Sequence, residues 1–282
     1  MIKKTLGISL LLLTMVFAFG ACDGEAQAQA QEITESALQV QDDINSYRFE
    51  TTSTMEMAGE TEGEAIEGSL IITQNGEFDP ANLKMHYIQT MISTMTGSYD
   101  VNTTMDTYVI EDEGYVASDN EFGEFSWSSG EIPEGFWEDM NQVDFELAML
   151  EASTKAKVIG SETVNGVDCY VLEISPAEEH LWELFMQQMG MSGGTADDAD
   201  DDLLKELVKH CSAKQWIAKD SYFLMKAEIT MSVELTPEMT GSSDVEGEVK
   251  IDTKLTLMAY DYNQPLSIEL PPGAEEAVEY SE

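Results

Sequence analysis

Apolar and polar residues alternate one by one along most of the chain after residue 46, a period that is typical of half-buried β-strands. The alternating stretches are residues 47–57, 69–73, 84–95, 99–110, 115–118, 122–127, 155–159, 169–174, 214–218, 222–235 and 249–257. Turn sequences separate many of them, such as Glu-Asp-Glu-Gly at residues 111–114 and Val-Asn-Gly-Val at residues 164–167. Because few helices intervene, we expect neighbouring strands to pair as an antiparallel meander.

Apolar residues at helical spacing occur in a few places around these strands. Ile33, Ala37, Val40 and Ile44 recur every three to four residues and predict an amphipathic helix that ends near Asn45. Shorter helices are predicted at residues 133–140, 144–152, 175–189 and 203–210. The pattern therefore predicts a mainly β protein of the α+β class, with a single domain at residues 32–273.

The first residues of the chain have the layout of an export signal. Lys3 and Lys4 precede an apolar run at residues 5–19. This run is shorter than the about 20 residues that a membrane-spanning helix needs. We therefore predict that the chain after this stretch lies outside the cytoplasm.

The end of the export signal resembles a lipobox, because two small residues directly precede Cys22. Phe19 stands where such boxes usually have Leu, Val or Ile. This interpretation makes residues 1–21 a cleaved signal peptide and Cys22 a lipidated N-terminus that anchors the protein to the outer face of the cell membrane. Two alternatives stay open: cleavage within residues 26–30, which would give a secreted protein, and an uncleaved anchor.

The chain is strongly acidic, with 13 Lys and Arg against 55 Asp and Glu and a formal net charge of −42. Nucleic-acid binding is excluded, since it requires clustered basic residues. We interpret the charge as a solvated acidic surface, and a cationic partner is the alternative. Three polar segments are predicted to lie outside the core: a flexible tether at 22–31, a mobile acidic loop at 190–202 and an acidic tail at 274–282.

Two cysteines remain once Cys22 is lipidated. Pairing of Cys169 with Cys211 in an oxidising compartment would close a loop of about 40 residues and stabilise the fold by about 4 kcal/mol. Two buried free thiols are the alternative. Asn102 begins an Asn-Thr-Thr glycosylation sequon, which is used only where the host glycosylates exported proteins.

Catalytic chemistry is poorly represented in the sequence. The histidines His86, His180 and His210 are scattered and lack a metal-ligand spacing. The acidic cluster at residues 197–202 lacks the glycine and terminal glutamate of an EF-hand loop. A phosphate-binding glycine loop and a Gly-x-Ser-x-Gly elbow are also missing from the sequence. We therefore expect a protein that is not an enzyme and that uses neither metal nor cofactor.

Methionine is unusually frequent in the predicted strands. The positions are Met55, Met57, Met85, Met91, Met95, Met105, Met225, Met231 and Met258. Flexible thioether side chains adapt to ligands of variable shape, whereas a tightly specified core prefers Leu, Ile and Val. Simple filling of an irregular core remains the alternative for any single methionine. Taken together, they favour an apolar cavity against the sheet.

Two stretches of the chain resemble a known superfamily. They are Val-Asn-Gly-Val-Asp-Cys-Tyr-Val-Leu at residues 164–172 and Gln-Trp-Ile-Ala-Lys-Asp-Ser-Tyr-Phe-Leu-Met-Lys at residues 215–226. Strand pairs of this kind recur in the lipoprotein-carrier superfamily, which includes the LolA and LolB carriers and the LppX/LprG lipid-binding lipoproteins. The resemblance implies a curved antiparallel half-barrel, with helices packed on its concave side and an apolar cavity between them.

The resemblance also implies a function, namely binding of a lipid or acyl chain without chemistry, possibly in lipid or lipoprotein transport. Candidate cavity residues are Phe136, Trp137, Leu181, Phe185, Met189 and Met231. The expected partners are an apolar ligand and, through the N-terminal lipid, a membrane; no protein partner is indicated. The competing interpretation is a structural or adhesive surface module with a filled core and no ligand.

Overall fold

The computed structural model describes residues 22–61, 64–119, 125–151, 153, 155–175, 208–235 and 249–279. Its helices are α1 (Cys22–Gln41), α2 (Phe136–Asp139) and α3 (Gln142–Glu151), with short 3-10 turns at Pro80–Asn82 and Ala274–Glu276. Its strands are β1 (Tyr47–Thr61), β2 (Glu64–Asp79), β3 (Lys84–Met95), β4 (Val101–Ile110), β5 (Glu113–Asp119), β6 (Phe125–Glu131), β7 (Lys155–Val164), β8 (Val167–Ser175), β9 (Val208–Ala218), β10 (Leu224–Leu235), β11 (Val249–Tyr260) and β12 (Val278–Glu279).

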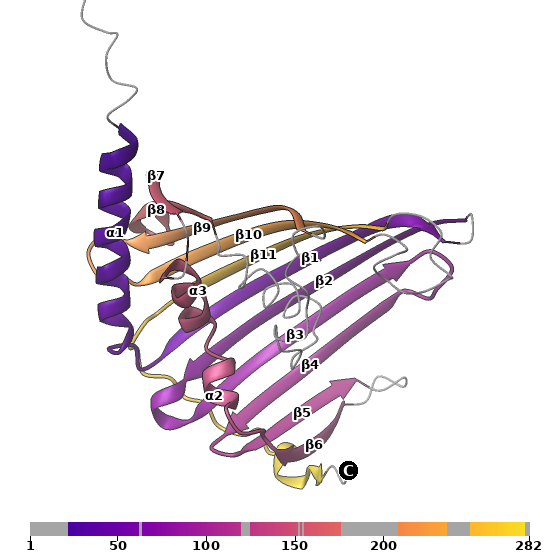
Figure 1. The fold of residues 1–282 in the computed structure, drawn as a ribbon. Coiled ribbons are helices and arrows are strands. Elements are labelled where there is room, and N and C mark those ends of the chain that lie inside the picture. The colour runs from indigo at the N-terminus through magenta and orange to yellow at the C-terminus, as the bar shows by residue number, and fades with distance from the viewer. Residues whose placement is uncertain are drawn as a thin grey trace, which may run out of the picture.

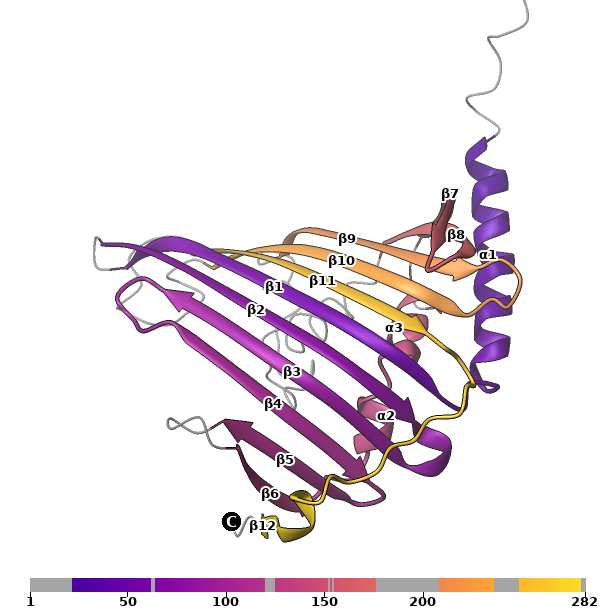
Figure 2. The ribbon, with the colours of Figure 1, turned by 180° about the vertical axis from the view of Figure 1, so that it is seen from behind.

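All these strands form one sheet in the order β12-β6-β5-β4-β3-β2-β1-β11-β10-β9-β8-β7. Neighbouring strands are antiparallel, except that β12 runs parallel to β6. The sheet is curved and unclosed, and α2 and α3 lie on one of its faces (Figure 1). Figure 2 shows the opposite face, which these helices leave uncovered. The predicted half-barrel architecture is confirmed.

Strand register decides which side chains share a face. Tyr47, Phe49 and Phe78 point to the side of α2 and α3, which we call the concave face, and they belong to the main core. Residues of opposite parity point to the convex face. There a second, smaller core forms around Trp216 and Met225, on the outer side of β8–β10.

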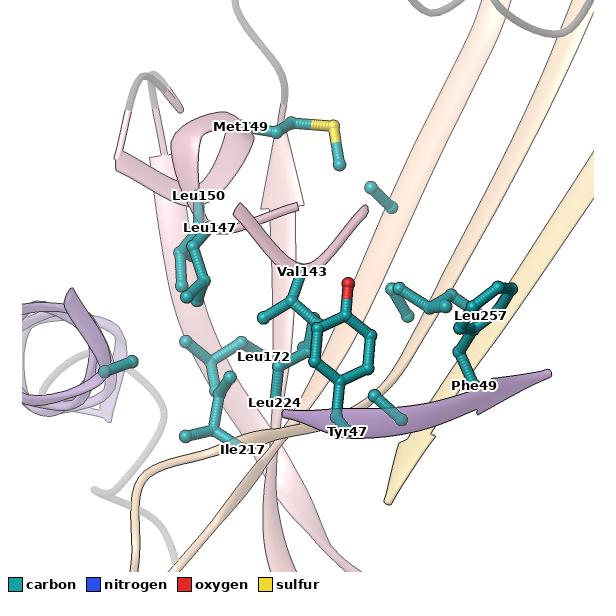
Figure 3. Close-up of a cluster of buried hydrophobic side chains, with 14 of the residues drawn as sticks. Tyr47, Phe49, Val143, Leu147, Met149, Leu150, Leu172, Ile217, Leu224 and Leu257 are labelled. Atoms are coloured by element: carbon teal, nitrogen blue, oxygen red, sulfur yellow. The ribbon is translucent and has the colours of Figure 1, made fainter. Parts of the chain in front are cut away.

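The helix α3 closes one end of the concave face. Its residues Val143, Leu147 and Leu150 are buried and face Leu172 and Ile217 of the sheet (Figure 3). Burying a side chain of this size contributes about 1.5–3 kcal/mol, so packing rather than intrinsic propensity holds this short helix.

The start of α3 depends on a side-chain cap. Asn141 is the capping residue, because Asn141 Oδ1 accepts the Asp144 backbone N–H at 3.3 Å. The same oxygen accepts the Tyr47 hydroxyl at 3.1 Å, which ties the helix start to β1.

The helix α1 stands at the β7–β9 edge of the sheet (Figure 1). It buries Ala30, Ile33 and Ala37 at helical spacing. The segment 22–31, predicted as a flexible tether, is helical and continuous with this helix, because Ala30 adds a buried contact one turn before Ile33.

Two further predictions at element ends need correction. Residues 208–210 were expected to close a helix but begin strand β9, since they pair with β10. The acidic segment from residue 274 was expected as a tail, yet it forms a 3-10 turn and strand β12 beside β6.

Several predicted features fall largely or wholly outside the described residues. They are the signal peptide, the helix at 175–189, apart from Ser175 at the end of β8, and the loop at 190–202. Among the helices that the structure does describe, none combines the length and apolar character required to cross a membrane.

Candidate functional site

The concave face changes character halfway along its central strands. Beside α2 and α3 it is fully buried, as at Phe78 and Met85. Farther along β1–β4 its side chains are mostly half-buried and rich in methionine. We call this part the methionine field, which consists of Met55, Met57, Leu70, Ile72, Met91, Met95 and Met105. It is the candidate ligand-binding surface.

Register places most of the strand methionines together. Those on the concave face are Met55, Met57, Met85, Met91, Met95, Met105 and Met231. Met225 and Met258 instead pack with the small convex core. Single methionines are common gap fillers, but residues from four strands that converge on one face make an adaptable surface.

This part of the concave face is also free of charge. The concave positions over residues 47–57, 66–78, 85–95 and 101–109 hold neither an acid nor a base. The convex positions of the same strands carry Arg48, Glu50, Glu77 and Asp106, among others. A protein with a net charge of −42 therefore keeps one broad surface neutral.

A glycine lets an aromatic row close the inner end of the methionine field. Phe49 and Tyr87 flank Gly76 in register on the neighbouring strands. A Cβ built on Gly76 would lie 2.7 Å from Phe49 Cζ and 2.7 Å from Tyr87 Cβ. Because such contacts are sterically forbidden, only glycine leaves room for the Phe49 ring and for Tyr87 at this point of β2.

At the outer end of the field, side chains also flank a glycine, but they lie farther from it. Met57 and Met95 flank Gly68 in register, and their Cε atoms lie 3.4 and 3.8 Å from a Cβ built there. Eight residues of β2 (76 − 68 = 8) separate the two glycine rows, which is about 26 Å at about 3.3 Å per residue. A bilayer core two acyl chains thick measures about 30 Å, so one chain fits within this length.

A row of polar side chains crosses the concave face directly beside the aromatic row. Thr51, Gln74 and Gln89 are cross-strand partners on β1, β2 and β3. The Thr51 hydroxyl donates to Gln74 Oε1 at 3.0 Å, and Gln74 Nε2 donates to Gln89 Oε1 at 2.7 Å. We call these three residues the polar row; it separates the packed core from the methionine field.

Two hollows lie at opposite ends of the strands. One, of about 490 Å³, opens at the Gly68 row and has Met57, Met95, Lys250 and Asp252 among its lining residues. The other, of about 610 Å³, lies beside α2, and Leu83, Ile132, Phe136 and Trp137 contribute to its wall.

The predicted cavity residues occupy different surroundings. Phe136 and Trp137 line the hollow beside α2 and also pack on the main core, where the Trp137 ring lies 5.9 Å from Phe78. The Trp137 indole N–H donates to the Glu111 carbonyl at 3.1 Å. Met231 is buried on the concave face of β10. The remaining candidates, Leu181, Phe185 and Met189, lie outside the described residues.

The predicted disulfide between Cys169 and Cys211 is absent, because both cysteines are free thiols. Cys169 pairs in register with Ala218 on β9, and Cys211 lies seven residues earlier on that strand (218 − 211 = 7), about 23 Å away at about 3.3 Å per residue. The two thiols also belong to opposite faces of the sheet. Burial raises the pKa of Cys211 to about 11, which disfavours its reactive thiolate.

The glycosylation candidate Asn102 is exposed on the convex face of β4. Residues of that face also include the exposed Ile71 and Ile92, which are cross-strand partners. Within the described ranges, no group of His, Cys, Asp and Glu side chains is arranged to hold a metal ion.

One buried carboxyl group was not anticipated from the sequence. Glu146 on α3 is 2% exposed, and burial raises its pKa to about 7, with an opposing hydrogen bond from Gln215 Nε2 at 3.2 Å. Gln215 Nε2 also donates to the Glu146 backbone carbonyl at 2.6 Å, while Gln215 Oε1 is buried without a partner in the part of the chain that the structure describes. The pair joins α3 to β9 within the core.

The polar row was also not predicted from the sequence. Gln74 lies two residues after Ile72, and Gln89 lies two residues before Met91, so both glutamines occupy positions of apolar parity. Polar residues at apolar parity were the available signal. Their mutual contact depends on register and could not be derived from either strand alone.

The comparisons with known proteins point to a family rather than to an activity. Residues 29–279 match the model of a family of unknown function, DUF6612. The chain belongs to this family. A search of curated proteins finds no match. Because DUF6612 is a family of unknown function, membership leaves the activity open.

Three solved structures are similar to this chain, each over 86% of its length. They are the Mycobacterium tuberculosis lipoprotein LppX (13% identity, 99% of that chain, TM-score 0.42), LprF from Mycobacterium bovis (11%, 97%, 0.45) and a DUF1329 family protein from Desulfovibrio piger (12%, 95%, 0.24). LppX is one of the proteins that the sequence resembles. All three TM-scores lie below 0.5, and the architecture described above rests on the coordinates of this chain.

Proposed function

We propose that this protein is an exported, membrane-anchored lipoprotein that binds a lipid or acyl chain on its concave face, without catalysing a reaction. The methionine field carries the proposal. It is neutral and mostly half-buried, it extends over six residues of β2 from the Gly68 row to the polar row (74 − 68 = 6), which is about 20 Å, and it is built from side chains that adapt to varied ligands.

Membrane anchoring through lipidated Cys22 is part of the same proposal. It is supported by the export signal and the small pair before Cys22. An anchored binder extracts or presents lipid at its own membrane, which is the step in lipid or lipoprotein transport that we assign to it.

The decisive experiment compares two neighbours on β3 that point to opposite faces. Met91 lies in the methionine field, and Ile92 is 41% exposed on the convex face. We expect Met91→Glu to reduce uptake of an apolar fluorescent probe at least tenfold, because it places a carboxylate in an apolar site. Ile92→Glu, the matched control, should bind like the wild type.

Mass spectrometry of gently purified wild-type protein provides the independent measurement. Co-purifying lipid that is lost from Met91→Glu and kept by Ile92→Glu would support the proposal. Absence of lipid together with absence of probe uptake by the wild type would favour the structural or adhesive module. Circular dichroism shows whether each variant is folded. If Met91→Glu and Ile92→Glu both lose their fold, Met91→Gln is used instead, because its side chain is neutral; it should weaken binding less than Met91→Glu.

A further inference from the structure

The polar row gives the otherwise apolar site a direction. Thr51 donates to Gln74, and Gln74 donates to Gln89, so both hydrogen bonds of the row run toward β3. The carbonyl oxygen of the last amide, Gln89 Oε1, is therefore occupied. The Nε2 group of Gln89 donates to none of the residues that the structure describes.

The position of Gln89 places this open donor at the border of the methionine field. Its neighbours along the concave face of β3 are Tyr87, in the aromatic row, and Met91, in the field. Its partner on β4 is Met105, also in the field. Gln89 is half-buried, so a ligand lying along the field would pass beside the amide.

The chain of hydrogen bonds fixes the amide and strengthens its donor. Gln74 holds Gln89 Oε1 at 2.7 Å, which leaves the Nε2 group facing away from β2. Hydrogen bonds in a chain polarise one another, and the effect is larger in an apolar environment. An acceptor atom on the ligand would satisfy Nε2, whereas a pure hydrocarbon would leave it desolvated and unpaired at a cost of about 1–3 kcal/mol.

The same surroundings disfavour an anionic acceptor. The concave positions around the polar row carry no base, and the molecule as a whole has a formal net charge of −42. A buried carboxylate would lose its hydration without gaining an ion pair. The fitting acceptor is an uncharged oxygen such as the carbonyl of an acyl ester.

We infer, on the basis of the proposed function, that Gln89 is the specificity-determining residue of the site. Its Nε2 group donates a hydrogen bond to the carbonyl oxygen of a neutral acyl ester, and the acyl chain of that ester lies along the methionine field. Gln74 and Thr51 are positioning residues for that amide. The ligand class is thereby narrowed from apolar molecules in general to uncharged acyl esters.

The test measures displacement of a bound apolar fluorescent probe by three ligands of one chain length: methyl oleate, the matching hydrocarbon and ionised oleate at pH 8. For the wild type we expect methyl oleate to bind about tenfold more tightly than the hydrocarbon, the contribution of about one neutral hydrogen bond. Oleate should bind most weakly. Equal binding of ester and hydrocarbon would overturn the inference.

Variants separate this inference from the proposed function. Gln89→Met removes the donor and extends the methionine field, so the ester preference should disappear while hydrocarbon binding is kept or improved. Gln74→Leu should lower the ester preference less. Thr90→Val, next to Gln89 on the convex face, is the matched control and should keep the wild-type ratio. An unchanged ratio of ester to hydrocarbon affinity in Gln89→Met would refute the role of Gln89. If none of the three ligands displaced the probe from the wild type, the proposed function itself would be refuted.

Discussion

At the scale of single residues, Glu146 is the carboxyl group, among those that the structure describes, whose pKa burial raises most strongly. It lies on the buried side of α3, and the side chain that hydrogen-bonds it is the neutral Gln215. Desolvation therefore disfavours its ionised form, and its pKa is raised from 4.5 to about 7.

This pKa predicts a loss of stability as the pH rises. Below pH 4.5 Glu146 is protonated in both the folded and the unfolded state. Between about 4.5 and 7 the unfolded chain releases the proton first, so the free energy of unfolding should fall by about 3 kcal/mol over this range and then level off. Urea unfolding of Glu146→Gln should lack this contribution and give a more stable protein than wild type at pH 8.

The control for this measurement is on the same helix. Glu151 is exposed, so Glu151→Gln should leave the pH dependence of unfolding unchanged. A wild-type slope retained in Glu146→Gln would mean that other carboxyl groups cause it.

At the scale of the elements, β2 is the strand on which both glycine rows depend. Most strand glycines of this sheet have space for a side chain, but Gly76 has none. Its absent Cβ leaves room for Phe49 and Tyr87, which lie on the core side of the polar row. A local steric requirement thus sets where the candidate site begins.

Gly76→Ala should be strongly destabilising, by about 1–3 kcal/mol or more, because the new Cβ would also lie 2.5 Å from the His86 carbonyl oxygen, which cannot move freely. Thermal unfolding monitored by circular dichroism measures the effect. Gly130→Ala on β6 is the matched control, since nothing lies within 4 Å of its Cβ position, and its unfolding temperature should stay close to that of the wild type. Equal shifts in both variants would contradict the steric explanation.

At the scale of the whole molecule, the segment that connects Cys22 to the sheet is a helix, although its composition predicts a flexible tether. The helix α1 has 20 residues and spans about 30 Å at about 1.5 Å per residue. It begins at Cys22 and packs along the β7 edge, so a lipid at that residue would be connected to the sheet through a helix. An anchored domain of this kind keeps a restricted orientation at the membrane.

Cys22→Ser should release the protein from the membrane fraction into the soluble fraction, because serine cannot carry the thioether-linked lipid. Fractionation of cells that express each form, followed by the mass of the mature chain, gives the readout. Asp23→Asn, which keeps the cysteine, serves as the control and should remain with the membrane. Membrane retention of Cys22→Ser would indicate an uncleaved signal instead.

Much of the fold was predictable from local pattern, and the failures share a cause. The alternation at residues 84–95 matches β3 residue for residue. The polar segments at 22–31 and from residue 274 were predicted to lie outside the core, yet Ala30 and Ala274 are buried by contacts with distant parts of the chain. Weakly amphipathic segments take their structure from such contacts rather than from propensity.

The candidate site was predictable in kind but not in position. Frequent methionine on strands indicated an adaptable apolar surface, and register then placed most of those residues on one face. Two of the predicted cavity residues, Phe136 and Trp137, pack on the core at one end, and the methionine field lies beyond the polar row. Helical periodicity could not decide this, because it does not specify which part of a sheet a helix covers.

By itself, the sequence determined the period-two strands, the antiparallel pairing of most strands with their neighbours in the chain and the excess of acid, since each depends on residues close together in the chain. The tertiary structure decided which parity of each strand faces the helices, that Cys169 and Cys211 lie on opposite faces, and that Thr51, Gln74 and Gln89 form one row. A one-residue change of register would reverse the face of every side chain on a strand. Register is set by turns and packing across the whole sheet, so only the folded molecule contains that information.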